Sequence, residues 1–151
     1  MANALYGKAR EKFLANAHGA EGTHISWTDD TIKVTLIDAA DYVIGANIDI
    51  HEYMNLDTVP AAAKIATATL GTKSVTLGVA DALDATFPLV TGHEAEVLLI
   101  WKDGGDGGTT QSGVLSPLIA YIDTATGLPV TPNGGDIVVV WDAGANKIFK
   151  L

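Results

Sequence analysis

Cysteine is absent from this 151-residue chain. Its absence excludes disulfide bonds, cysteine-ligated zinc sites and thiol catalysis. Long apolar runs are also missing: the longest, such as 97–101 and 137–141, are about five residues, whereas a membrane-spanning helix needs about twenty. The first residues are charged from Lys8 onward and show no signal-peptide core. We therefore expect a protein made in the cytoplasm that has no membrane partner.

Basic residues are scarce, with 9 lysines and arginines against 18 acidic residues and a net charge of −9. Because phosphate backbones are bound by lysine and arginine, we expect no nucleic-acid partner. The few basic residues are unevenly placed, since Lys8, Arg10 and Lys12 lie within five residues and only Glu11 opposes them. A basic N-terminal segment therefore precedes a strongly acidic body.

The composition is otherwise that of a globular protein, with 48% hydrophobic and 18% charged residues. The length is that of one domain, and we expect 1–151 to form a single one. Residues 2–16 are predicted to form a helix that Asn3 caps, with Leu5, Ala9 and Phe13 on one apolar stripe. The basic residues would lie mostly off that stripe. So short a helix is marginal alone in water and must dock on other structure.

Residues 24–151 change to short strands and turns, which predicts a mainly β protein, an antiparallel β-sandwich or jelly-roll-like fold of about eight short strands. In 94–102 both faces of the strand are apolar, so it should lie between two packed layers, with 115–123 as its antiparallel partner. The last two strands are predicted to form a terminal hairpin. The expected strands are 31–38, 42–50, 65–70, 74–79, 85–90, 94–102, 115–123, 136–142 and 146–151.

Motifs for chemistry are weak. The four histidines stand apart without metal-ligand spacing, and no nucleophile elbow or phosphate loop is complete. The glycine-rich segment 103–113 is read as a mobile hairpin tip, with a calcium loop as the less favoured alternative. The three tryptophans are read as core or interface residues, with a sugar-binding platform as the alternative. We therefore expect neither an enzyme nor a cofactor.

Three stretches, 2–14 (ANALYGKAREKFL), 31–42 (TIKVTLIDAADY) and 116–151 (SPLIAYIDTATGLPVTPNGGDIVVVWDAGANKIFKL), resemble a family of small structural proteins of tailed-bacteriophage virions. The segments 44–63 and 103–113 match no pattern of that family. The resemblance implies a decoration or cement protein on the phage head surface, which binds the major capsid protein and copies of itself, with a trimer as one possible oligomer. A tail or fibre module that contacts cell-surface sugar is the alternative.

The residues expected to make these contacts lie at the two ends of the chain. They belong to the helix stripe, the basic trio and the terminal hairpin. Each could instead belong to the intramolecular core. The candidates are Leu5, Lys8, Ala9, Arg10, Lys12, Phe13, Trp141, Ile148 and Phe149.

Overall fold

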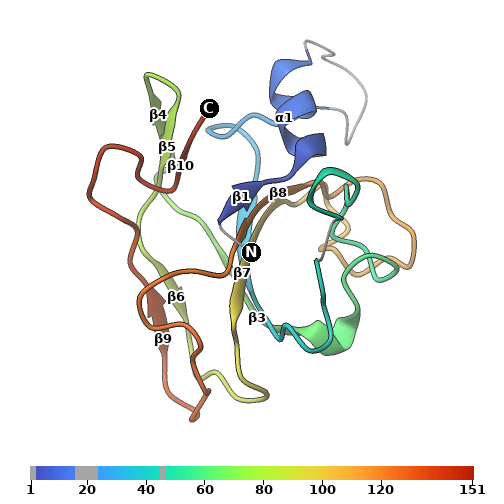
Figure 1. The fold of residues 1–151 in the computed structure, drawn as a ribbon, viewed down its shortest axis with the longest axis vertical. Helices are drawn as coiled ribbons and strands as arrows, with labels where there is room; N and C mark the ends of the chain where they lie inside the picture. The colour runs from blue at the N-terminus through green and yellow to red at the C-terminus, as the bar shows by residue number, and fades with distance from the viewer. Residues whose placement is uncertain (1–2, 16–23, 45–46) are drawn as a thin grey trace.

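A computed structural model describes residues 3–15, 24–44 and 47–151. Within these ranges the protein is mainly β, with ten strands in antiparallel sheets and one α-helix near the N-terminus (Figure 1). The predicted sandwich-like fold class is therefore confirmed. The middle layer is a five-stranded sheet in the order β1–β8–β7–β2–β3. Its strands are β1 (Ala4–Leu5), β2 (Ile32–Ile37), β3 (Lys64–Thr69), β7 (Val97–Lys102) and β8 (Leu118–Ile122).

Strands β2 and β7 lie at the centre of this sheet and pair in antiparallel register, with Val34 opposite Ile100 and Leu36 opposite Leu98. The side chains of β7 are buried from Val97 to Trp101, on both faces of the strand. This confirms the prediction that it lies between two packed layers. Its predicted pairing with β8 is confirmed as well.

One covering layer consists of small sheets (Figure 1). A three-stranded sheet has the order β10–β5–β4, and a two-stranded sheet pairs β6 with β9. Buried residues from both small sheets join the same hydrophobic cluster as the middle sheet. The strands are β4 (Ser74–Thr76), β5 (Val79–Asp81), β6 (Ala85–Phe87), β9 (Ile137–Val139) and β10 (Phe149–Lys150).

The opposite face of the middle sheet is covered by chain without strands, including the short 3-10 helices η1 (Asn47–Asp49) and η2 (Ala61–Ala63). Segment 103–116 folds back over residues 51–60, where the Leu56 and Asp57 amides donate to the carbonyl oxygens of Thr110 and Gln111. A Cβ on Gly108 (φ +66°) would lie 2.7 Å from the Met54 carbonyl oxygen. The segment thus packs as a covering layer instead of projecting as a hairpin tip.

The helix α1 (Gly7–Leu14) is shorter than predicted. Asn3 does not cap it, because the Asn3 side chain instead accepts from the amides of Asp123 and Thr124 and donates to the Thr124 carbonyl. These bonds hold Ala4 and Leu5, the residues before the helix, as strand β1 against β8. Leu5 is therefore a strand residue opposite Ala120. The prediction that the helix extends over Ala4 and Leu5 is therefore wrong, and its outer ends at 2 and 16 lie outside the described residues.

Three other predicted elements differ from the structure. The predicted strand 74–79 contains a turn at Leu77 and Gly78, after which the chain returns as β5. The separate strand β5 was not predicted. The predicted terminal hairpin is also wrong, because β9 pairs with β6 whereas β10 pairs with β5. In the predicted strand 42–50, residues 47–49 are 3-10 helical and 45–46 lie outside the described residues.

No helix within the described ranges is long and apolar enough to cross a membrane.

The buried indole of Trp101 provides a test of the middle layer. Its Nε1 donates to Thr35 Oγ1 at 2.8 Å, and Thr35 Oγ1 lies 2.8 Å from Thr67 Oγ1. We expect Thr35→Val to lower the free energy of unfolding by about 1–3 kcal/mol, because the buried indole N–H loses its acceptor. Thr67→Val, the control, leaves that bond in place and should cost less. Equal losses in urea unfolding would contradict this assignment.

Candidate functional site

The basic residues of α1 are paired within the chain. Lys8 Nζ lies 2.9 Å from Glu11 Oε2, and Arg10 Nη2 lies 2.9 Å from Asp49 Oδ1. Both pairs are at least one-third exposed and therefore contribute little to stability. Their charges are already compensated inside the molecule, which weakens the expectation that this face attracts an acidic partner.

Lys12 lies in a different environment. Its side chain is 9% exposed, although the sequence analysis placed the basic residues mostly off the buried stripe. Lys12 Nζ lies 3.0 Å from Glu52 Oε1, and 3.4 Å from the hydroxyl of Tyr53. Burial alone would raise the pKa of Glu52, but hydrogen bonds from Lys12 and Tyr53 outweigh it and lower that pKa. Lys12 therefore anchors the helix to the 47–60 segment.

The apolar contact candidates at the two ends of the chain meet each other. The Phe13 ring lies 6.0 Å from the Phe149 ring, and Trp27 packs edge-on against Phe149 at 5.1 Å. Ala9 is fully buried, whereas Leu5 and Ile148 are partly buried. The helix and the C-terminal segment thus contact each other within the chain. The sequence had left open whether these residues form such an internal contact or bind a partner.

Two neighbouring grooves lie between the β1–β8 edge and the C-terminal segment, with volumes of about 770 and 840 Å³. Asn3, Ile122 and Ile148 line both grooves. Leu5, Arg10 and Phe149 line the first groove, and Trp141 lines the second. Most of the predicted contact residues therefore surround these grooves.

A hydrogen-bonded chain links the start of α1 with residue 51. The hydroxyl groups of Tyr6 and Tyr42 lie 2.8 Å apart, and Tyr42 Oη lies 2.9 Å from His51 Nδ1. Burial raises the pKa of both tyrosines and lowers that of His51. All three groups are thus held in their neutral forms near pH 7, which suits a structural tie better than proton transfer.

The tryptophans do not form a common surface platform. Trp27 and Trp101 are 4% and 1% exposed, and each indole N–H has an acceptor inside the chain. Trp141 is partly buried and donates to the Leu83 carbonyl. The prediction that the tryptophans are core residues is therefore right for Trp27 and Trp101. The alternative, a sugar-binding platform made of all three tryptophans, is wrong.

The glycine-rich segment satisfies its own carboxylates. Asp103 accepts from the amides of Gly105 and Gly107 and pairs with Lys33. Asp106 accepts from the Gly108 amide and from the hydroxyls of Thr110 and Ser116. Burial opposes ionisation of each carboxyl, but these bonds prevail and lower both pKa values. Because their oxygens are occupied by donors of the chain, the calcium alternative loses support.

Exposed leucines in left-handed backbone conformations are functional candidates that the sequence analysis missed. Leu77, in the turn between β4 and β5, has a φ of +52° and is 90% exposed. Leu89, shortly after β6, has a φ of +50° and is 74% exposed. On the neighbouring strand β9 and directly after it, Val138 and Val140 are 54% and 71% exposed. We call Leu77, Leu89, Val138 and Val140 the outer apolar set.

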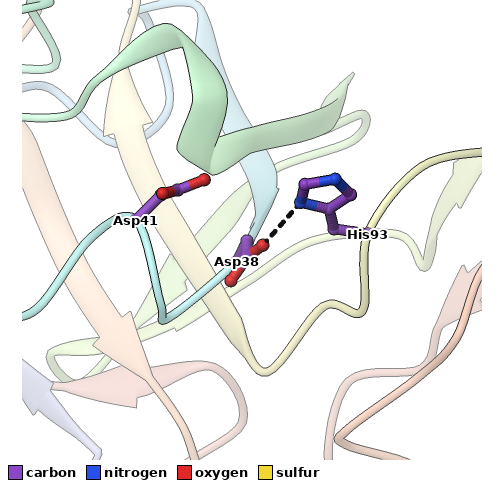
Figure 2. A group of neighbouring side chains, drawn as sticks. All are labelled: Asp38, Asp41 and His93. Carbon is purple, nitrogen blue, oxygen red and sulfur yellow. Dashed lines mark hydrogen bonds and ion pairs between the residues drawn. The ribbon is translucent and has the colours of Figure 1, made fainter.

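A second missed group joins residues far apart in sequence. Asp38 and Asp41 lie in the turn after β2, and His93 approaches from the segment before β7 (Figure 2). His93 Nδ1 is 3.0 Å from Asp38 Oδ2. A hydrogen bond from the Ala40 amide, and to a smaller extent one from His93, lowers the pKa of Asp38. Spacing could not reveal this group, because 55 residues separate Asp38 from His93.

The Lys12–Glu52 pair predicts a pH-dependent stability. Since the folded pKa of Glu52 is lowered, its contribution to stability is present above the ordinary glutamate pKa of 4.5 and is lost as the pH falls through the folded pKa. Glu52→Gln should lower the free energy of unfolding at pH 7 by about 1–3 kcal/mol. In urea unfolding at pH 7 and pH 3, the variant should lose less stability on acidification than the wild type. Glu11→Gln, in an exposed pair, is the control; parallel pH profiles for wild type and Glu52→Gln would contradict the assignment.

Neither a family model nor a curated protein matches this chain, so the resemblance to phage virion proteins stays a prediction.

Proposed function

We propose that the chain is a structural protein of a tailed-phage virion, a decoration or cement protein that binds and stabilises the head lattice through protein–protein contacts. Two considerations support this proposal. Stretches at both ends of the chain resemble such proteins, and the outer apolar set exposes apolar side chains that partners could cover.

The exposed leucines carry the proposal. A left-handed conformation costs a branched residue about 1–2 kcal/mol, and turns with positive φ favour glycine or asparagine. Folding alone would therefore not select leucine at 77 or 89, and water gives an exposed leucine no compensating gain. Contact with a partner would provide that gain, because burying a leucine side chain contributes about 1.5–3 kcal/mol.

The surface charge suits the same role. The body of the chain is acidic, and a net negative charge keeps particles from adhering to one another. The strand β4 is a short edge strand of its sheet, to which a neighbour's strand could be added. The partners in this proposal are the major capsid protein and further copies of the chain, as in a trimer.

Immunogold labelling of virions tests the location. Many gold particles distributed over the head would support the cement role. Label confined to the tail would favour the receptor-binding alternative, and absence from purified virions would refute both.

The leucines give a sharper prediction. The double variant Leu77→Asn/Leu89→Asn should leave the free protein as stable as the wild type or raise its free energy of unfolding by up to about 1 kcal/mol per site, since asparagine tolerates positive φ. The same double variant should bind heads at least tenfold more weakly in cosedimentation, because two buried contacts are lost. Val114→Thr, at an exposed valine of the other covering layer, is the control. Unchanged binding by the double variant would contradict the proposed surface.

A further inference from the structure

We infer that Asp38, Asp41 and His93 form a binding site for a divalent transition-metal ion of the zinc type. Their ligand atoms, two carboxylate oxygens and one imidazole nitrogen, all lie within 4.8 Å of one another (Figure 2). This inference does not depend on the proposed virion role, because none of the three residues belongs to the outer apolar set.

The turn after β2 holds the two carboxylates on one side. The Asp38 carbonyl accepts from the amides of both Asp41 and Tyr42, which closes a single helical turn and brings residues three apart together. Glu96, directly before β7, holds the same turn in place, because its Oε2 accepts a hydrogen bond from the Ala39 amide at 2.9 Å. These bonds fix the backbone of both aspartates, and the Asp38 side chain is held as well, because its Oδ1 accepts from the Ala40 amide.

The geometry of the histidine suits a tetrahedral ion. Ligands about 2.0–2.1 Å from zinc lie about 3.3 Å from each other, and the observed distance between His93 Nδ1 and Asp38 Oδ2 is 3.0 Å. An ion could therefore bridge these two atoms after small movements. In the observed contact Nδ1–H of His93 donates to the ionised Asp38 carboxylate. On metal binding the proton of the neutral ring would move to Nε2, which frees the Nδ1 lone pair without net loss of a proton.

The electrostatics favour a cation at this place. Within the described part of the chain, no lysine or arginine pairs with Asp38 or Asp41, and the Asp41 carboxylate has no hydrogen-bond partner. Asp38 is mostly buried, and hydrogen bonds from the Ala40 amide and from His93 lower its pKa, so the carboxylate is ionised at neutral pH. Two carboxylates with a single imidazole match borderline zinc-type ions, and water would complete the fourth position.

The test is calorimetric titration of the full, untagged chain with zinc chloride. We expect one zinc ion per chain, and at least about tenfold weaker binding in both His93→Gln and Asp41→Asn. His24→Gln is the matched control, because His24 lies outside the group, and it should bind as the wild type does. Nitrogen-15 NMR of the imidazoles should show that Nδ1 of His93 shifts on addition of zinc.

Several results would overturn the inference. One is the absence of saturable heat with the wild type, and another is zinc binding that survives in either His93→Gln or Asp41→Asn. A third is an equal loss of zinc affinity in His24→Gln, which would indicate adventitious binding to histidines. All three side chains to be replaced are partly or fully exposed, and unchanged thermal melting of the apo variants would show that the fold is intact.

Discussion

Burial of the central strands on both faces is the constraint on which the rest of this structure depends. The side chains of β7 from Val97 to Trp101 are apolar and buried, so water must be excluded from both sides of the middle sheet. A five-stranded sheet alone cannot do this, and two further layers are required. The remaining chain is arranged to provide them.

The two covering layers meet this requirement in different ways. The layer formed by residues 47–63 and 103–116 has few regular hydrogen bonds, so side chains must satisfy its backbone. Asp103, Asp106 and Asn55 do so, through bonds to nearby amides and carbonyls. Segments 47–63 and 103–116 are thus in contact with each other, and they form one structural unit.

The opposite layer leaves apolar groups in water. Along β9, Ile137 and Val139 are partly buried against the core, whereas Val138 and Val140 point outward. Leu77 and Leu89 add exposed apolar groups in backbone conformations that leucine rarely adopts. Both covering layers expose apolar side chains, since Ile50 and Val114 are exposed as well. Among the described residues, only Leu77 and Leu89 combine that exposure with a backbone conformation unfavourable for leucine.

The sequence predicted the elements whose signal is local. Alternation in β2 and the double apolar pattern of β7 were readable, as was its pairing with β8. The missed features depend on distant partners. Asn3 has the chemistry of a helix cap, but Thr124 and Asp123 are its partners in the fold. The turn at Leu77 lacks the usual Asn-Gly signal, and the grouping of Asp38 with His93 exists only after β2 and β7 pair.

Hydrogen–deuterium exchange of the chain, free and bound to phage heads, tests most directly whether the outer apolar set is the binding surface. The account predicts slower exchange on binding in peptides that cover 74–79, 86–90 and 136–141, and unchanged exchange in 97–102, which is buried in both states. Protection confined to 103–116, or no change at any peptide, would contradict it.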